Sequence, residues 1–396
     1  MNIIVYRYGN ICETDIIESF RQSGLSVTEI TIEITDKNLS NAARIEAVDK
    51  ELSGLHPLFL FSINFYPALA KLCKLRKIPY LCWTVDSPVS ELFSEFVTYD
   101  TNRIFLFDRA QYKRFAPYNP SHIFHLPLAS ATNRFDEVIR TISAQDKKQF
   151  AGDISFVGSL YSEKNPLAKA SGLSAYTKGY LDALESASIK IFGYNPVELS
   201  LTSEVISDII RSIPGFYRIG KTVEPCESYI CAHNYIGMEI SMKERINTLK
   251  YLAQFFDVNL YTYSDTSVFD DCLHKPNMCG SVASLTEMPK VFHLSKINLN
   301  MTIKPIQEGL PLRIFDIMGC GGFCMTNFQP ELPDHFEIGT DLEAYSGLEE
   351  LADKCAYYLS HEDERKKIAA NGYQKVCSGH TYMHRIKTML EKAFAT

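Results

Sequence analysis

A chain of 396 residues is long enough for about two to three domains, each with its own hydrophobic core. Hydrophobic residues make up 46% of it and charged residues 22%, which is typical of a soluble globular protein. The formal net charge of −7 argues against a general binder of nucleic acids or anionic membranes, because such proteins need a basic surface. The N-terminus enters a strand-like segment directly, and no apolar run reaches the roughly 18 residues of a membrane span, so we expect a cytoplasmic location.

The eleven cysteines fit a reducing compartment, since many lie in apolar segments and none forms a C-x-x-C pair. Two groups resemble metal ligands: Cys226 and Cys231 before His233, and the pair His380 and His384. Neither group has the further ligands that a zinc site requires. We therefore expect reduced core cysteines, surface histidines and no metal site.

The first half of the chain alternates short apolar segments with amphipathic ones. Strands are expected at residues 2–6, 27–34, 58–63, 79–85, 103–107 and 122–126, and helices at 14–22, 42–52, 67–76 and 110–115. This alternation favours right-handed crossovers and a parallel, doubly wound sheet. Ligands bind to such sheets at the carboxyl ends of the strands.

Two loops at expected strand ends carry acidic side chains. Glu13 follows the first strand, and Asp86 lies near the single tryptophan, Trp83, just before Ser87 and Pro88. A carboxylate beside an aromatic ring can act as a base or hold a sugar hydroxyl, with its pKa raised if it is desolvated. The alternatives are an Asx-type turn for Asp86 and first-turn helix charge for Glu13.

A polar segment at residues 131–152 lacks strand signals, and we expect it to be a linker between a domain of residues 1–130 and one of residues 153–372. The second sheet is predicted to open at 153–157. In the loop that follows, Gly158 and Lys164 could cradle and neutralise a diphosphate. The loop matches neither the P-loop nor G-x-G-x-x-G, so neither an ATPase nor a dinucleotide-dependent dehydrogenase is indicated.

Residues 165 to about 250 show helical spacing at 176–186, 204–213, 228–236 and 242–256, which predicts a helical insertion that serves packing, acceptor binding or partner binding. The sheet is expected to resume at 257–261, followed by a helix at 286–294. After a polar turn at 329–336, helices are expected at 348–359 and 362–371, with Gly372 as a C-cap. A final helix is predicted at 381–393, within a C-terminal segment of residues 373–396.

The central segment of the second half is residues 296–327, where two buried strands at 296–301 and 323–326 flank a short helix. Pro311 marks the start of the helix and a glycine cluster marks its end. Arg313 and Asp316 then share one helix face. A helix start with an adjacent arginine suits a phosphate, and Asp316 can accept hydrogen bonds from two sugar hydroxyls. The alternative is an ordinary Arg–Asp pair on a solvated face.

The sequence resembles the CgeB-like (spore-maturation protein type) glycosyltransferases over nearly its whole length. The resemblance is carried by DISFVGSLYSEKNP, MPKVFHLSKINLNMT, GLPLRIFDIMGCGGFCMTNFQPELPDHFEIGTDL and RKKIAANGYQKV, and in the front half by LFSINFYPALAKLCKLRKIPYLCWTVDSP. It implies an α/β fold of the GT-B type: two Rossmann-like, doubly wound parallel-sheet domains facing a cleft. The C-terminal domain would hold a nucleotide-sugar donor, and the last helix could return to the N-terminal domain.

The resemblance also implies roles for particular residues. Asp316 stands where related GT-B enzymes place an acid that binds the donor ribose, although they usually have Glu. Glu308, eight residues earlier, has the spacing of the E-x7-E motif of retaining enzymes, whose first acid contacts the sugar. Lys164 stands where a phosphate-binding lysine is common, while Ser159 replaces its usual arginine companion. Arg313 would then supply the missing charge.

The expected donor-binding set is completed by Gly158, Lys304 and Val282. The function implied is transfer of a sugar from a nucleoside-diphosphate sugar, with a UDP-sugar favoured, to a protein, glycan or small-molecule acceptor. No cofactor or metal is expected, because cations and helix starts would stabilise the leaving diphosphate. If Glu308 contacts the donor sugar, retention is favoured. If the enzyme inverts, Asp86 is the first candidate base and Glu13 the second.

Two other classes of function stay open. One is a nucleotide-sugar epimerase on the same fold, which would use a single sugar nucleotide and no acceptor. The other is a non-catalytic protein that binds a nucleotide sugar or a partner. Sugar, acceptor and oligomeric state cannot be determined from these residues.

Overall fold

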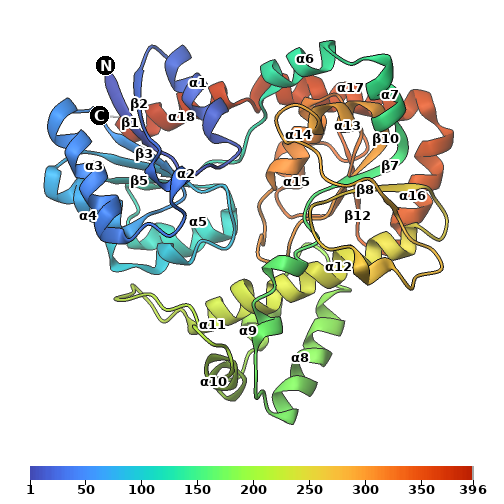
Figure 1. The fold of residues 1–396 in the computed structure, drawn as a ribbon, viewed down its shortest axis with the longest axis horizontal. Helices are drawn as coiled ribbons and strands as arrows, with labels where there is room; N and C mark the ends of the chain where they lie inside the picture. Colours follow the sequence, from blue (N-terminus) through green and yellow to red (C-terminus); the bar gives the residue numbers. More distant parts are fainter. Residues whose placement is uncertain (395–396) are drawn as a thin grey trace. The chain divides into compact units, whose positions relative to one another are not determined.

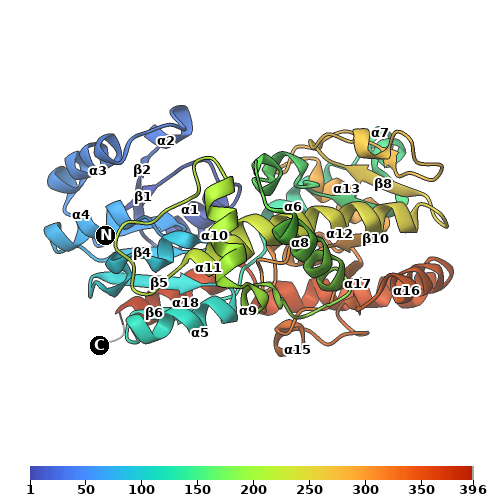
Figure 2. The ribbon, with the colours of Figure 1, turned by 90° about the horizontal axis from the view of Figure 1, so that it is seen from below.

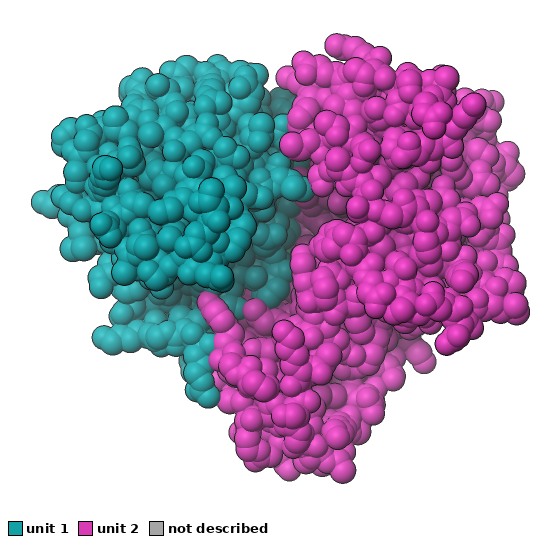
Figure 3. Space-filling model, viewed as in Figure 1, with its two compact units in different colours: residues 1–129, 218–226, 380–396 teal, residues 130–217, 227–379 magenta. Residues whose placement is uncertain are grey.

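The computed structural model describes residues 1–394 and divides the chain into two compact units (Figure 3). Unit 1 contains residues 1–129, residues 218–226 and the C-terminal residues from 380. Unit 2 contains residues 130–217 and 227–379. None of the helices within residues 1–394 has the length and apolar character to cross a bilayer.

Unit 1 is built on a six-stranded parallel sheet with the order β2-β1-β3-β4-β5-β6 (Figure 1). Every residue of β3 and β4 is buried, as expected of strands covered on both faces. The strands are β1 (Asn2–Tyr6), β2 (Ser26–Ile30), β3 (Leu60–Ile63), β4 (Tyr80–Trp83), β5 (Asn102–Leu106) and β6 (Ile123–His125). The helices are α1 (Glu13–Gln22), α2 (Ile32–Thr35), α3 (Asn41–Leu55), α4 (Pro67–Arg76), α5 (Arg109–Phe115) and α18 (Tyr382–Phe394).

Unit 2 contains a second six-stranded parallel sheet with the order β12-β11-β10-β7-β8-β9. Its strands are β7 (Gly152–Val157), β8 (Val258–Tyr261), β9 (Asn277–Met278), β10 (Ser295–Asn300), β11 (Cys324–Asn327) and β12 (Glu343–Tyr345). Its helices outside the insertion are α6 (Thr132–Arg140), α7 (Ala144–Phe150), α13 (Met288–Leu294), α14 (Leu312–Gly319), α15 (Leu332–His335), α16 (Leu348–Ser360) and α17 (Glu362–Gly379). The prediction of two doubly wound parallel sheets is confirmed.

The predicted helical insertion is present between β7 and β8 and extends away from the sheet of unit 2 (Figures 1 and 2). It contains α8 (Ala175–Ser188), α9 (Val197–Ser200), α10 (Ser203–Ser212), α11 (Glu227–Tyr229), the π-helical turns Ile230–Ile236 and α12 (Gly237–Leu252). Its residues 218–226 belong to unit 1, where the carboxylate of Glu224 accepts bonds from Arg114 Nε and Tyr118 Oη, each at 2.7 Å.

Three expectations about elements are wrong. The segment at 131–152 is not a linker, because it folds into α6 and α7 of unit 2, and α7 begins with a capping box formed by Ser143 and Asp146. The strand expected at 27–34 ends at Ile30 and is followed by α2. Gly372 is not a C-cap but lies inside α17, where close packing requires a residue without a side chain.

The strand orders fix where ligands can bind. In unit 1, β2 follows β1 toward one edge of the sheet, while β4 follows β3 toward the other edge, so the strand order reverses between β1 and β3. In unit 2 the strand order reverses in the same way between β7 and β10. In open α/β sheets, ligands occupy the crevice at the carboxyl ends of the strands beside such a switch point. The predicted acidic residues of unit 1 follow β1 and β4, and the predicted donor residues of unit 2 follow β7, β9 and β10.

Candidate functional site

Two of the predicted donor-binding side chains of unit 2 lie at the start of α14, in the connection from β10 to β11. Arg313 Nη1 lies 3.4 Å from Asp316 Oδ2, so the predicted pair forms. The guanidinium also stacks on Phe292, 5.2 Å from the ring centre. Asp316 is only 4% exposed, so the alternative of an ion pair on a solvated face is wrong. A phosphate can bind at a helix start that carries a partly buried cation.

The loop after β7 carries three of the predicted donor residues: Gly158, Ser159 and Lys164. Ser159 Oγ donates to Glu163 Oε1 (2.6 Å) and accepts from the amide of Tyr161 (2.7 Å). Ser159 therefore shapes the loop and is engaged within it. Lys164 is exposed and lies over the ring of Tyr161, 5.5 Å from its centre, and its ammonium group also interacts with Tyr263.

Arg245 on α12 was not predicted from the sequence, yet it joins the two strand ends at the switch point. Its Nη1 donates to the carbonyl of Ser159 after β7 (2.5 Å), and its Nη2 donates to the carbonyl of Met301 after β10 (2.7 Å). The guanidinium also lies 4.6 Å from the ring centre of Tyr161. Burial lowers the pKa of Arg245, with the like charge of Arg313 acting in the same direction.

Lys304 and Glu308 lie in the segment between β10 and α14. Lys304 Nζ pairs with Glu244 Oε1 of α12 at 2.8 Å and donates to the carbonyl of Ile191 in the insertion. Burial raises the pKa of Glu244 to about 7, although Lys304 lowers it. The lysine is thus engaged with the insertion, and a contact with the donor stays a prediction. Glu308 is half-buried, and its carbonyl accepts from the amide of Glu331 at 3.1 Å.

Val282 is half-buried in the loop that joins β9 to α13. Nearby, the amide of Ala283 donates to Glu287 Oε2 at 2.7 Å, which orders the loop just before the helix. Val282 and the other predicted donor residues thus follow β7, β9 and β10 of one sheet. Their contacts with a donor stay predictions.

In unit 1, the two predicted carboxylates have different environments. Asp86 is exposed after β4, and its Oδ2 accepts from Asn64 Nδ2 (2.7 Å) and from Tyr8 Oη (3.2 Å). Burial, together with the charge of Asp86, raises the pKa of Tyr8. Trp83, expected beside Asp86, is instead a core residue whose Nε1 donates to the carbonyl of Leu126 (3.0 Å). The aromatic residue beside Asp86 is Tyr8.

Glu13 is only 2% exposed and holds the loop after β1. Its carboxylate accepts from the amides of Tyr8 (2.8 Å) and Gly9 (3.0 Å) and from Arg7 Nε (2.9 Å). A carboxylate with these three partners is fixed in position. The geometry favours a structural role for Glu13, and Asp86 is the accessible one of the two predicted acids.

The three histidines considered as metal ligands have other partners. Nε2 of His233 lies 3.3 Å from Glu198 Oε2, Nδ1 of His380 lies 2.7 Å from Arg385 Nη2, and Nδ1 of His384 lies 2.7 Å from Thr381 Oγ1. Within residues 1–394, no three His, Cys, Asp or Glu side chains converge as a group that could hold a metal ion. The expectation of a reaction without a metal stays a prediction.

Comparison with known proteins supports the glycosyltransferase class. Residues 261–391 match a family described as glycosyl transferase-like. A stretch of 70 residues, which is 18% of this chain, is 30% identical to spore protein CgeB of Bacillus subtilis (strain 168). That match spans only a fifth of the length of CgeB.

Solved structures resemble the chain over its full length. A glycosyltransferase from Rickettsia africae ESF-5 aligns with a TM-score of 0.55 at 11% identity, covering 99% of this chain and 97% of that one. Anabaena Alr3699/HepE in complex with UDP and glucose aligns with a TM-score of 0.54 at 10% identity, covering 100% of each chain. Sucrose-phosphate synthase from Thermosynechococcus elongatus also has a TM-score of 0.54 at 10% identity, over 100% of this chain and 99% of that one. At these identities the likeness establishes the fold, which is that of the GT-B glycosyltransferases.

Proposed function

We propose that the chain is a glycosyltransferase that moves a sugar from a nucleoside-diphosphate sugar to an acceptor. The observation that carries the proposal is the pair of Arg313 and Asp316 at the start of α14, beside the switch point of the second sheet. The pair lies inside the segment that matches the glycosyl transferase-like family. The motifs shared with CgeB-like enzymes and the short match to CgeB support a relationship to that group.

In this proposal, three of the donor residues have a defined task. Asp316 accepts hydrogen bonds from the ribose hydroxyls, while Arg313 and Lys164 neutralise the diphosphate as it leaves. The positive end of the α14 helix dipole adds to the positive potential. These groups stabilise the leaving charge without a metal ion. A UDP-sugar is the favoured donor, since the similar HepE structures contain UDP or UDP-glucose.

The stereochemical outcome depends on which acid assists the reaction. If Glu308 contacts the donor sugar, we propose retention, with the leaving phosphate helping to deprotonate the acceptor. If the reaction inverts, Asp86 is the base, because Glu13 is buried and fully engaged. The acceptor is a protein, a glycan or a small molecule, and we place the reaction in the cytoplasm.

Binding of UDP to purified variants tests the donor site. Asp316→Asn and Arg313→Ala should each weaken UDP binding about 10-fold to 100-fold, because a hydrogen bond to a charged group contributes about 1.5–3 kcal/mol. Arg211→Ala is a matched control, since Arg211 forms the same kind of i,i+3 pair with Asp208 in α10 of the insertion. Wild-type UDP affinity in both folded variants would refute the site assignment.

Product analysis separates the proposed activity from its rivals. Incubation with single nucleotide sugars and a panel of acceptors should yield free nucleoside diphosphate and a glycosylated acceptor. An isomerised donor without released diphosphate would indicate an epimerase. A thermal shift with one donor and no turnover on any acceptor would indicate a binding protein.

A further inference from the structure

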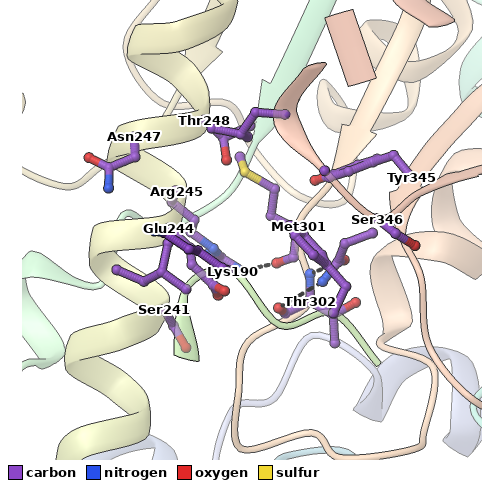
Figure 4. A pocket seen from close by; sticks show the side chains of 15 residues that line it. Lys190, Ser241, Glu244, Arg245, Asn247, Thr248, Met301, Thr302, Tyr345 and Ser346 are labelled. Atoms are coloured by element: carbon purple, nitrogen blue, oxygen red, sulfur yellow. Dashed lines mark hydrogen bonds between the residues drawn. The ribbon is translucent and has the colours of Figure 1, made fainter. Parts of the chain in front are cut away.

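A cavity of about 310 Å³ lies within unit 2, on the α12 side of the sheet (Figure 4). Its walls come from α12, from the residues after α8, and from the carboxyl ends of β10, β11 and β12. Its volume is at the lower end of the roughly 300–1,000 Å³ that is usual for small-molecule sites. Neither Arg313 nor Asp316 lines it, so it is separate from the residues assigned to the nucleotide.

One wall of the cavity is aromatic and apolar. The rings of Phe192 and Tyr345 meet edge to face, with centres 5.9 Å apart and an interplanar angle of 66°. Met301 and Leu348 extend this surface. At one end Arg245, whose guanidinium is bonded to the carbonyl of Ser159, connects the cavity to the loop after β7. The site can therefore bury one face of a ring-sized ligand.

Two hydroxyl groups face the cavity. Tyr345 is 2% exposed, and its hydroxyl points from β12 toward α12 across the cavity (Figure 4). Thr248, 6% exposed, faces the same space from α12. Buried polar groups are almost always hydrogen-bonded, because an unpaired one costs about 1–3 kcal/mol. At this cavity the side-chain atom Arg245 Nε is buried and has no hydrogen-bond partner among residues 1–394. Together with the two hydroxyls that face the same space, it indicates a polar ligand.

A carboxyl group faces the same space. Glu244 lines the cavity from α12 and is close enough to Tyr345 that its charge, together with burial, raises the pKa of the phenol. The site thus offers hydroxyl donors, a carboxylate acceptor and an aromatic wall. A ring hydroxyl can both donate and accept hydrogen bonds, so a polyhydroxylated ring matches all of these groups at once.

We propose that this cavity binds a neutral sugar ring through Tyr345, Thr248 and Glu244, with the ring packed against Phe192. The proposal rests on the proposed glycosyl transfer, and it adds a saccharide subsite formed by the insertion. The sugar is either the hexose of the nucleotide-sugar donor or a separate saccharide such as an acceptor. Both sources present the same hydroxylated ring.

The test compares ligands on the full-length protein and two isosteric variants. Tyr345→Phe and Thr248→Val each remove one hydroxyl while keeping the volume of the side chain. Binding of UDP, UDP-glucose, glucose, galactose and N-acetylglucosamine is measured by calorimetry and by saturation-transfer NMR. Tyr261→Phe is the control, because it removes a buried tyrosine hydroxyl at the end of β8, outside the cavity.

We expect Tyr345→Phe to weaken sugar binding about tenfold, with UDP affinity unchanged. If UDP-glucose weakens while UDP does not, the cavity holds the hexose of the donor. If a free saccharide weakens while UDP-glucose does not, the cavity holds a separate sugar. The proposal is overturned if none of these sugars binds the wild type, or if binding of every sugar is equal in Tyr345→Phe, Thr248→Val and the wild type. If the proposed nucleotide site is wrong instead, the wild type should not bind UDP but should still bind a free sugar.

Discussion

At the scale of single residues, environment separates carboxylates that look alike in the sequence. Glu13 and Asp86 both follow strands of the first sheet, and either qualified as a base. In the structure, three hydrogen bonds hold Glu13 to the loop it supports, whereas Asp86 is exposed and oriented by Asn64 and Tyr8. The position of Glu13 suits a residue that stabilises the loop, and the position of Asp86 suits a residue that can reach a substrate.

Substitution of the two acids should therefore have opposite effects. Glu13→Ala should lower the free energy of unfolding by about 1–3 kcal/mol, because two backbone amides and Arg7 lose their acceptor. Asp86→Asn should leave stability within about 0.5 kcal/mol. If NMR of the product anomer shows that the enzyme inverts, Asp86→Asn should also lower kcat by about 10² to 10⁴, the range for a lost general base. Wild-type kcat in Asp86→Asn of an inverting enzyme would exclude Asp86 as the base.

The residues that the sequence did not reveal share one property. Arg245 and Glu244 lie outside the motifs and Tyr345 lies just after one of them, and their contacts are with segments more than 50 residues away. Periodicity predicted a helix at 242–256, which overlaps α12 but begins and ends later than it, and periodicity cannot show which strand ends a helix side chain will reach. The motif around Arg313 and Asp316 was predictable because both residues lie in one short helix.

At the scale of elements, continuous apolar runs were the most reliable signal. β1 and α4 have the predicted bounds, since a buried strand and a proline-started helix leave few alternatives. Helix ends marked by glycine alone were less reliable. Glycine is the residue type typical of a helix C-cap, yet α17 continues through Gly372 to Gly379. The reason is tertiary packing, because a Cβ at Gly372 would lie 2.3 Å from the carbonyl oxygen of Asp341.

This packing predicts the effect of a methyl group at the position. Gly372→Ala should lower the free energy of unfolding by about 1–3 kcal/mol, despite the higher helix propensity of alanine, because backbone must move to admit the Cβ. Chemical denaturation measures the change. The control is Gly179→Ala in α8, where a Cβ would meet nothing within 4 Å and should be neutral or stabilising by up to about 1 kcal/mol. Equal stability changes in the two variants would contradict the packing explanation.

At the scale of the whole molecule, residues that are far apart in the sequence belong to the same compact unit. Unit 1 is assembled from three separate stretches, and the last of them contains α18. That helix packs within unit 1: Tyr382 lies edge-on to Trp83 with ring centres 6.1 Å apart, and Phe394 lies 5.8 Å from Phe59. Arg385 Nε also donates to the carbonyl of Pro127 at 2.8 Å. The C-terminal residues thus complete the core of the first sheet.

A substitution in α18 should therefore destabilise a sheet that lies more than 250 residues earlier in the chain. Ile386 is fully buried, so Ile386→Ala should cost about 2–5 kcal/mol from lost burial and a residual cavity. Hydrogen exchange resolved by peptide should show the loss of protection in β1, β3 and β5, while β7 and β10 of unit 2 keep theirs. The neighbouring Lys387→Ala, at an exposed position, should change nothing beyond about 0.5 kcal/mol. Equal loss of protection in both sheets would mean that the two units unfold together, and loss confined to unit 2 would contradict the assignment of α18 to the first core.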